Sequence, residues 1–251
     1  MNALFDLTGS TALVTGARGG IGRAVAVALA RAGADLVLHG HRDDLADTEA
    51  EVIAAGRRAR RWVRDLLRLE GLSQDATALA RETTVDILIN NAGVIRRAAA
   101  LDTTAEDWRD VLTVNLDAAF ILTRAIGTEM VRRRRGKIIT IASLLSFQGG
   151  INVVGYAASK HAVVGMTRAL ANEWAPHGIQ VNALAPGYIA TENTAALRAD
   201  PFREPEIRGR IPAARWGTPE DLAGAAVFLA APASDYVCGQ VLTVDGGWLA
   251  R

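Results

Sequence analysis

Tyr156 and Lys160 are the residues of this sequence best placed to move a proton. They are four positions apart within an expected helix, 156–174, and so share one helical face. A phenol has an ordinary pKa of about 10 and is a poor base at neutral pH, but a nearby ammonium group stabilises the phenolate. The pair therefore predicts a general acid and base acting on an oxygen, with Lys160 lowering the pKa of Tyr156.

Other polar residues follow expected strands. Ser143 comes after the apolar run 137–141, Asn90-Asn91-Ala92-Gly93 follows a second strand, and Pro186-Gly187 follows a third. Asn115, inside a helical stretch, can fix a water or an opened backbone carbonyl. Each alone is more often a cap or turn residue. Because ligands of open α/β sheets bind at the carboxyl ends of the strands, their joint placement predicts a site there.

A glycine-rich turn joins the expected first strand to the first helix, with the sequence Thr15-Gly16-Ala17-Arg18-Gly19-Gly20-Ile21-Gly22. Glycines let backbone N–H groups approach a pyrophosphate, and the positive end of the helix dipole faces the anion. Such a turn is a weak signal alone, since it can be a mere tight turn. Its position between strand and helix favours a dinucleotide site.

The end of the expected second strand bears on which dinucleotide binds. An acidic residue there would bind the ribose 2′-hydroxyl of NAD, whereas an arginine can hold the 2′-phosphate of NADP. This sequence has Gly40 at the expected acid position, followed by His41 and Arg42. Arg18 and Arg42 can both face the 2′ side, although surface arginines are commonly just solvated. The residues at the end of this strand are compatible with NADP(H) as well as with NAD(H) as the cofactor.

The elements that must position these residues alternate between short apolar runs and longer helical stretches. Strands are expected at 11–15, 35–39, 60–64, 85–89, 137–141, 179–183 and 241–244. Helices are expected at 21–32, 44–55, 73–82, 105–133 (bent or broken near Asn115), 156–174 and 219–230. The alternation predicts an α/β fold, a doubly wound parallel seven-stranded sheet with helices on both faces.

No linker or repeat divides the chain, so one domain, 1–251, is expected. The stretch 187–216 is the least regular and is expected to be a substrate lid.

Lys+Arg 28 against Asp+Glu 27 leaves a net charge of +1, which favours neither nucleic acid nor membrane. One cysteine, no signal segment, no apolar run of about 18 residues and no metal-ligand spacing among four histidines predict a cytoplasmic protein without a metal.

From about Leu7 to the C-terminus the sequence resembles the short-chain dehydrogenase/reductase family. The resemblance is carried by TGARGGIG, NNAG, Asn115, Ser143, Tyr156-Ala157-Ala158-Ser159-Lys160 and Pro186-Gly187. It implies a single-domain Rossmann fold with a nicotinamide cofactor, and hydride transfer between a ketone and a secondary alcohol. A homotetramer is also implied, with the helical stretch 157–170 and the C-terminal DGGWLAR as candidate contacts.

The resemblance also implies residue roles. Tyr156 would be the acid/base, Ser143 would bind the substrate oxygen, Lys160 would bind the nicotinamide ribose, and Asn115 would hold a relay water. Gly16, Gly20 and Gly22 would line the pyrophosphate, and Asp65 would contact the adenine. Asn91 and Gly93 would lie at the adenosine ribose. Ile189 and Thr191 would contact the nicotinamide carboxamide and the phosphate. The whole expected cofactor set is Gly16, Arg18, Gly20, Ile21, Gly22, His41, Arg42, Asp65, Leu66, Asn91, Ala92, Gly93, Tyr156, Lys160, Pro186, Gly187, Ile189 and Thr191.

Longer tracts narrow the resemblance within the family. NNAGVIRR, IASLLSFQGG, ANEWAPHGIQVNALAPGYIATENT, RIPAARWG and SDYVCGQVLTVDGGWLAR are similar to family members that act on deoxy keto sugar acids. They imply NAD(H)-linked interconversion of 2-keto-3-deoxygluconate and 3-deoxy-2,5-diketogluconate in uronate breakdown. The sequence departs from that group at Gly40-His41-Arg42, and this difference weakens the inference that the chain shares the group's preference for NAD.

A sugar acid needs a cation for its carboxylate and adaptable hydrogen-bonding groups for its hydroxyls. The expected substrate residues are Arg96, Arg97, Gln148, Asn152, Arg203 and Arg215. At least one of these arginines is expected to bind the carboxylate, while a solubilising surface charge is the ordinary alternative for each.

Two other functions stay open at this point. One is a reductase of the same fold acting on a 3-oxoacyl thioester or another polyol. The other is a non-catalytic dinucleotide-binding redox sensor, which would have no need for Ser143, Tyr156, Lys160 and Asn115 together.

Overall fold

The computed structural model describes residues 3–251 and is built around a parallel sheet of seven strands. The strands are β1 Thr11–Val14, β2 Asp35–Gly40, β3 Ala59–Val63, β4 Ile87–Asn90, β5 Gly136–Ile141, β6 Ile179–Pro186 and β7 Val241–Val244. Their order is β3-β2-β1-β4-β5-β6-β7, and every neighbouring pair is parallel. The chain reverses direction across the sheet between β1 and β4, the switch point at which such sheets bind ligands.

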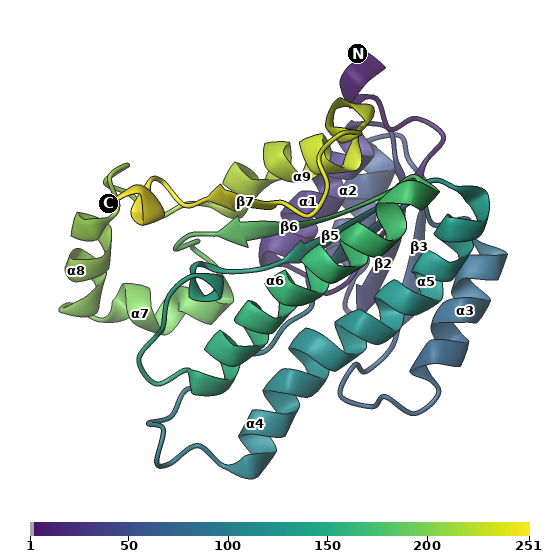
Figure 1. Cartoon of the computed structure of the whole chain (residues 1–251). Helices are drawn as coiled ribbons and strands as arrows, with labels where there is room; N and C mark the ends of the chain where they lie inside the picture. The colour runs from purple at the N-terminus through teal and green to yellow at the C-terminus, as the bar shows by residue number, and fades with distance from the viewer. Residues whose placement is uncertain (1–2) are drawn as a thin grey trace.

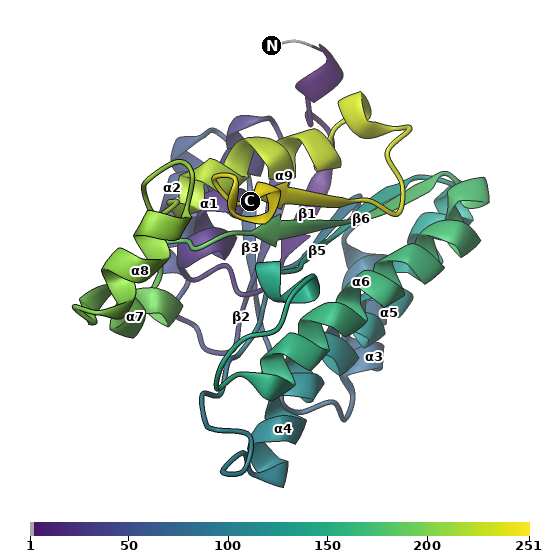
Figure 2. The same ribbon diagram turned by 60° about the vertical axis from the view of Figure 1, so that its left-hand side comes forward.

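Helices cover both faces of the sheet, which confirms the predicted doubly wound fold (Figures 1 and 2). The helices are α1 Gly20–Arg31, α2 Ala46–Ala54, α3 Leu72–Glu82, α4 Ala105–Leu112, α5 Ala119–Arg133, α6 Val154–Trp174, α7 Ala195–Ala199, α8 Arg203–Arg210 and α9 Ala223–Ala230. α1, α2 and α9 lie on one face, and α3, α5 and α6 lie on the other.

Successive residues of the strands pack into two separate apolar layers, one on each face of the sheet. Ala12 and Val14 of β1 pack with α1 and α9, whereas Leu13 between them packs with α3, α5 and α6. All three side chains are fully buried. A strand whose successive side chains are buried on opposite faces must be apolar throughout, which is why these runs are continuous rather than alternating in sequence.

The predicted break near Asn115 is confirmed. α4 and α5 are joined by a π-helical turn, Thr113–Ala118, with Asn115 buried inside it. π-helical turns within helices are frequent at functional sites because they leave backbone groups outside the regular hydrogen-bond ladder. The whole stretch Ala105–Arg133 is long and apolar enough to cross a membrane, but 56% of its most apolar window is buried inside this fold, as expected of a core helix.

The segment 187–216 is more regular than its sequence suggested. It contains α7 and α8, and an isolated bridge pairs Ile189 with Gly217 across its two ends. Pro205 lies in the first turn of α8, where a missing N–H costs nothing, and Asp200 accepts the N–H groups of Phe202 and Arg203 at 2.9 and 3.0 Å. The expectation of an irregular loop was wrong, because prolines that open or precede helices resemble loop residues in sequence.

Candidate active site

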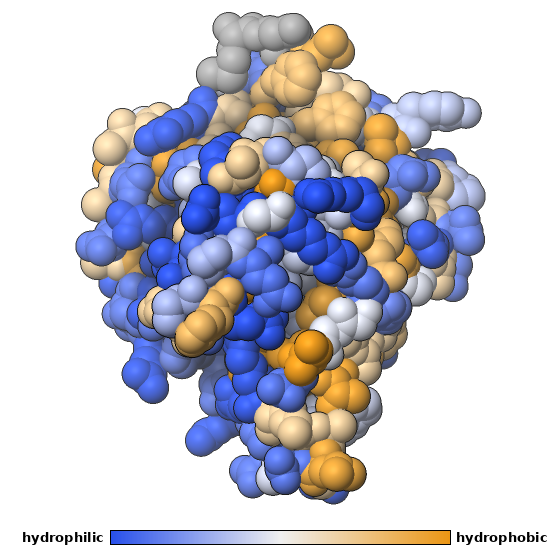
Figure 3. All heavy atoms as spheres, turned by 90° about the vertical axis from the view of Figure 1, so that its left-hand side faces the viewer, coloured by the Kyte–Doolittle hydropathy of each residue, from blue (hydrophilic) through white to orange (hydrophobic). Residues whose placement is uncertain are grey.

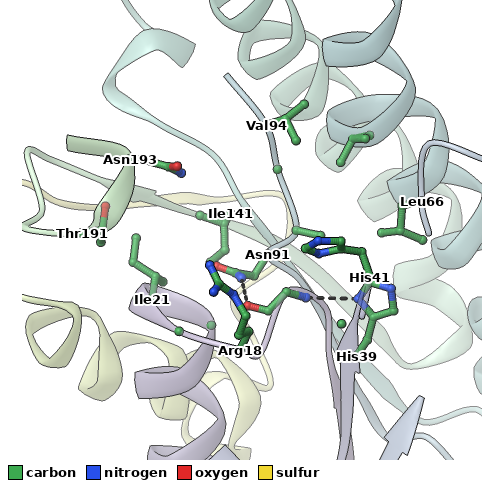
Figure 4. A pocket seen from close by; sticks show the side chains of 18 of the residues that line it. Arg18, Ile21, His39, His41, Leu66, Asn91, Val94, Ile141, Thr191 and Asn193 are labelled. Atoms are coloured by element: carbon green, nitrogen blue, oxygen red, sulfur yellow. Dashed lines mark hydrogen bonds between the residues drawn. The ribbon is translucent and has the colours of Figure 1, made fainter. Parts of the chain in front are cut away.

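A cavity of about 460 Å³ lies at the carboxyl ends of β1, β2, β4 and β5, beside the switch point (Figure 4). The glycine-rich turn forms one wall and Asn91-Ala92-Gly93 another. Tyr156 and Lys160 of α6 also line it, as do Thr191, Glu192 and Asn193 from the segment after β6. Residues from both halves of the chain therefore meet around one volume, as the sequence predicted.

The glycine-rich turn is shaped by contacts that exclude side chains. A Cβ on Gly22 would lie 2.1 Å from the Gly16 carbonyl oxygen and 2.5 Å from the Asn91 amide nitrogen. Asn91 Nδ2 donates to the carbonyl of Thr15 at 2.8 Å, which holds the turn in place. No side chain caps the N-terminus of α1 at Gly19, so its first N–H groups are left for an anion. This cradle fits a pyrophosphate.

Two residues that the sequence did not single out brace the same turn. His39 Nδ1 accepts a hydrogen bond from the Gly16 N–H at 3.2 Å, and His39 Nε2 meets the Arg64 carbonyl at 2.8 Å. Thr48, fully buried on α2, donates to the Ala17 carbonyl at 2.8 Å. Burial lowers the pKa of His39 to about 4, so the imidazole is neutral at pH 7. Its role went unnoticed because a buried histidine in a strand has no sequence signature.

The far end of the cavity is lined by Gly40, His41, Asp65 and Leu66. Arg18 also lines it, but its guanidinium is already engaged by Glu192 at 2.8 Å and Asp44 at 3.6 Å. Of the two arginines expected at the 2′ side, Arg42 does not line the cavity, whereas its neighbour His41 does.

Tyr156, Lys160 and Ser143 come together as predicted. The Lys160 ammonium lies 5.5 Å from the centre of the Tyr156 ring and donates to the Ile141 carbonyl, at the end of β5, at 2.6 Å. The Ser143 side chain lies close enough to the Tyr156 hydroxyl to lower its pKa. Ser143 is held by a one-turn helix, Leu144–Ser146, whose Ser146 donates to the Lys160 carbonyl at 2.6 Å. The three groups are thus fixed to one another through α6.

Comparison with known proteins places this geometry in a family. A family model described as enoyl-(acyl carrier protein) reductase matches residues 16–249. The 2-dehydro-3-deoxy-D-gluconate 5-dehydrogenase of Bacillus subtilis (strain 168) is 53% identical over 247 residues, covering 98% of this chain and 97% of that relative. The chain belongs to the short-chain dehydrogenase/reductase family. This confirms the family predicted from the sequence and its enzyme class, the NAD(P)-dependent oxidoreductases that act on CH–OH groups.

Two solved structures of the family are close in sequence and shape. One, assigned as an NAD(P)-dependent gluconate 5-dehydrogenase of Beutenbergia cavernae with bound NADP at low occupancy, is 58% identical with a TM-score of 0.97, covering 99% of this chain and 100% of that one. The other, assigned as a 2-deoxy-D-gluconate 3-dehydrogenase of Agrobacterium tumefaciens with bound NADP, is 50% identical with a TM-score of 0.92, covering 100% of both chains.

Burial shifts the pKa values of both Tyr156 and Lys160 in this short-chain dehydrogenase/reductase. Burial raises the pKa of Tyr156, and the hydrogen bond from Ser143 and the charge of Arg97 only partly oppose that rise. The pKa of Lys160, which is 5% exposed, is lowered by burial to about 8. The predicted acidity of Tyr156 included the charge of the oxidised nicotinamide ring, so it stays a prediction; in the chain alone, burial penalises the phenolate more than its neighbours stabilise it.

Asn115 is near the catalytic helix but does not line the cavity. Its Oδ1 accepts from the Val94 N–H at 2.8 Å, and its Nδ2 donates to the Val94 carbonyl at 3.0 Å and to Ser159 Oγ at 3.1 Å. Asn115 therefore ties the strand end that carries Asn91 to α6, one residue from Lys160.

Most of the expected cofactor residues line the cavity, and four do not. The four are Arg42, Pro186, Gly187 and Ile189; Ile189 is 4% exposed and belongs to the core. A Cβ on Gly187 would meet Asp245 Cα at 2.6 Å, so this glycine serves the packing of the C-terminal segment. Cavity residues that sequence reasoning missed are Gly19, His39, Gly40, Leu67, Val94, Val114, Ile141, Glu192 and Asn193.

None of the expected substrate residues lines the cofactor cavity, and most of the arginines have acidic partners. Arg96 pairs with Asp107 and Asp110 at 3.5 and 3.1 Å. Arg203 pairs with Glu206 at 3.4 Å and Arg215 with Asp221 at 2.6 Å. Gln148 is half-buried and Asn152 exposed, both away from the cavity wall.

Arg97 differs from the other three arginines. Its Nη2 donates to the backbone carbonyl of Asn193, a cavity residue, at 3.3 Å, and its charge acts on Tyr156. Within residues 3–251 no carboxylate is paired with it. It is therefore the expected arginine that lies nearest the reacting groups with its charge uncompensated.

Proposed function

We propose that this enzyme interconverts a ketone and a secondary alcohol of a deoxy keto sugar acid, 2-keto-3-deoxygluconate and 3-deoxy-2,5-diketogluconate, with a nicotinamide dinucleotide. The observation that carries the proposal is that Tyr156 and Lys160 line the same cavity as the glycine-rich turn, with Ser143 near enough to Tyr156 to lower its pKa. The activity named for the Bacillus subtilis relative supports the substrate class. A non-catalytic redox sensor would gain nothing from this arrangement.

Proton transfer falls to Tyr156. In reduction its hydroxyl gives a proton to the substrate carbonyl oxygen, and in oxidation its phenolate takes the proton of the hydroxyl. Ser143, whose side chain lowers the pKa of Tyr156, would donate to the same substrate oxygen. The bound nicotinamide supplies or accepts the hydride. Its oxidised ring and the Lys160 ammonium both favour the phenolate, opposing the effect of burial.

The walls of the cavity fit each part of the dinucleotide. The glycine-rich turn and the uncapped start of α1 would hold the pyrophosphate. His41, Asp65 and Leu66 would surround the adenosine, and Ala92 and Gly93 would lie along its ribose. Lys160 would bind the nicotinamide ribose, with Thr191 covering the turn at 3.4 Å from a Cβ built on Gly20. NAD(H) and NADP(H) both fit this set.

Arg97 is the proposed partner of the substrate carboxylate. It is uncompensated, acts electrostatically on Tyr156 and contacts the segment 191–193. On the face of the molecule that α7 and α8 present, hydrophilic residues gather at the centre and left, with apolar residues toward the lower right (Figure 3). The segment 187–216 would act as the substrate lid, with α7 and α8 as its moving parts.

Initial rates with NADH and NADPH on 3-deoxy-2,5-diketogluconate, 5-ketogluconate and a 3-oxoacyl thioester test the proposal. The expected order is the deoxy keto acid first, 5-ketogluconate second and the thioester last. 5-Ketogluconate is the second candidate because the Beutenbergia relative is assigned to gluconate. Turnover of the thioester without either sugar acid would overturn the substrate class, and cofactor binding without any turnover would favour the sensor.

A homotetramer and a cytoplasmic location are part of the same proposal. Exposed Trp108, Phe120 and Val154 on α4, α5 and α6 offer an apolar face for a second copy. The C-terminal DGGWLAR tail is the other proposed contact, although its Trp248 is buried within its own chain beside Tyr188, 4.7 Å between ring centres. Light scattering of the purified protein measures the number of chains.

A further inference from the structure

The segment 141–146, which carries Ser143, is fastened to α6 at both of its ends through one residue, Lys160. At the first end, the Lys160 ammonium donates to the Ile141 carbonyl at 2.6 Å. At the other end, the Ser146 hydroxyl donates to the backbone carbonyl of Lys160, also at 2.6 Å. Ser143 lies between these two points, and Tyr156 precedes Lys160 by about one helical turn of α6. The two contacts therefore fix where Ser143 stands relative to Tyr156.

Ser146 also contacts Ser143 directly. The Ser146 hydroxyl oxygen accepts the Ser143 N–H at 3.3 Å, and the Ser143 hydroxyl oxygen accepts the Leu145 N–H at 3.1 Å, as in a capping box. A serine hydroxyl has one proton to donate and two lone pairs that accept. Because the Leu145 N–H occupies a lone pair of Ser143, the hydroxyl proton is the group that Ser143 offers to a substrate oxygen.

The same short segment packs against the proposed lid. Leu144, which is 4% exposed, belongs to an apolar cluster with Ile207 of α8 and with Ile211. Ser146 is 7% exposed and makes its contact with α6 instead. Without the Ser146 hydroxyl, the apolar contact with the segment 187–216 would remain, whereas the second hydrogen bond to Lys160 would be lost. Ser143 would then follow the lid more than the helix that carries Tyr156.

We propose that Ser146 is a positioning residue, which holds Ser143 so that its hydroxyl and that of Tyr156 reach the same substrate oxygen. The inference rests on the proposed function, since it concerns the hydrogen-bond donor of that reaction. The proton of Ser146 is already used by the Lys160 carbonyl, so Ser146 acts on the substrate only through Ser143. A donor aimed at a reacting oxygen is effective when it is held in place before the reaction, and small displacements weaken it.

The first test compares Ser146→Ala with the wild type in reduction of 3-deoxy-2,5-diketogluconate. We expect kcat to fall about tenfold, less than the roughly 10²-fold loss for deleting a donor to the reacting oxygen. KM should change less than kcat, because the Ser143 contact strengthens in the transition state. Dinucleotide affinity, measured by calorimetry, should stay that of the wild type, since Ser146 contacts only Ser143 and the Lys160 backbone.

Ser234→Ala is the matched control for loss of a buried hydroxyl. Ser234 is fully buried after α9, and its hydroxyl contacts the Leu229 and Ala231 carbonyls at 3.0 Å. Both alanine variants should have lower melting temperatures than the wild type, because each loses buried hydrogen bonds. Only Ser146→Ala should lose kcat.

A double variant separates positioning of Ser143 from a general loosening of the site. If Ser146 acts through Ser143, adding Ser146→Ala to Ser143→Ala should leave kcat where Ser143→Ala alone leaves it. The pH profile provides a second measurement. The Ser143 side chain lowers the pKa of Tyr156, so the pKa that governs the rate should rise in Ser146→Ala, in the same direction as in Ser143→Ala.

A wild-type kcat in Ser146→Ala would overturn the inference, as would losses that multiply in the double variant or a loss of dinucleotide binding. If Ser146→Ala does not fold, Ser146→Cys gives the same comparison, because a thiol fills the site and hydrogen-bonds weakly. Failure of the proposed function shows separately, as a wild type that turns over neither keto acid. The four-variant comparison then uses whichever carbonyl compound the enzyme reduces.

Discussion

The Gly16 N–H donates to His39 Nδ1 at 3.2 Å, so the first glycine of the dinucleotide turn is held by a neutral imidazole. Because Nε2 must donate to the Arg64 carbonyl, only the Nε2–H tautomer satisfies both contacts. His39 thereby connects the turn after β1 to the loop after β3, and a proton on Nδ1 would break the contact to Gly16.

Protonation of His39 is expected to destabilise the protein in acid. Its pKa is about 4 in the folded chain and about 6.5 in an unfolded one, so the unfolded state binds more protons between these values. The free energy of unfolding should therefore fall as the pH drops from 6.5 to 4, by about 3 kcal/mol from this group. In His39→Phe, urea unfolding should show a lower stability at pH 7 and a shallower acid loss. An acid loss as steep as that of the wild type would contradict this assignment.

Alanine substitutions at Gly22 and Gly19 are expected to have different effects. Gly22 is packed closely within the turn, whereas Gly19 has open space around it and lines the cavity. Gly22→Ala places a methyl group 2.1 Å from the Gly16 carbonyl, so the turn must shift and the melting temperature should fall by several degrees. Gly19→Ala meets nothing within 4 Å in the chain. It should fold normally yet weaken dinucleotide binding, because Gly19 lines the cavity. Thermal melts with and without NADPH distinguish the two variants. If Gly22→Ala and Gly19→Ala had equal melting temperatures without cofactor, the close packing of Gly22 would not explain its effect.

Apolar patterning predicted the sheet and the main helices closely, because buried parallel strands must be continuous apolar runs. The position of His39 could not be predicted, since a polar residue in such a run has no distinguishing neighbour in sequence. The same holds for the ion pair of Arg18 with Glu192, which joins positions 174 apart. The rise in the pKa of Tyr156 within the chain alone could not be predicted either, because spacing shows which groups are near one another and does not show how far water is excluded.

Tyr156→Phe removes the proton donor and leaves the ring in place. We expect kcat to fall by 10²- to 10⁴-fold, the usual contribution of general acid–base catalysis. NADPH affinity, followed by nicotinamide fluorescence, should change less than threefold, because the substitution removes one hydroxyl and keeps the ring. Ser143→Ala should lower kcat and raise the pKa that governs the rate. A kcat for Tyr156→Phe close to that of the wild type would refute the mechanism.

Lys160 makes the cofactor-free protein less stable than it would be with an apolar residue. Its pKa is lowered to about 8, so the folded state binds fewer protons than the unfolded one between pH 8 and 10.5, and stability rises with pH over that range. Below pH 8 the buried ammonium costs up to about 3 kcal/mol, less the hydrogen bond to the Ile141 carbonyl. Lys160→Met should thus be inactive but more stable at pH 7, with an advantage that shrinks by pH 9.5. A less stable variant at pH 7 would show that the hydrogen bond outweighs the burial of charge.

Arg97 should be needed for binding a carboxylate and little else. In Arg97→Leu we expect KM for the keto acid to rise at least tenfold, since one charge-assisted contact contributes about 1.5–3 kcal/mol. kcat should fall less, although the lost charge also raises the pKa of Tyr156 somewhat. Arg96→Leu and Arg215→Leu are the matched controls, because both side chains are already paired with aspartates. The methyl ester of the substrate provides the second control: it should have the same high KM in wild type and in Arg97→Leu. If the variant still discriminates between acid and ester, another group holds the carboxylate.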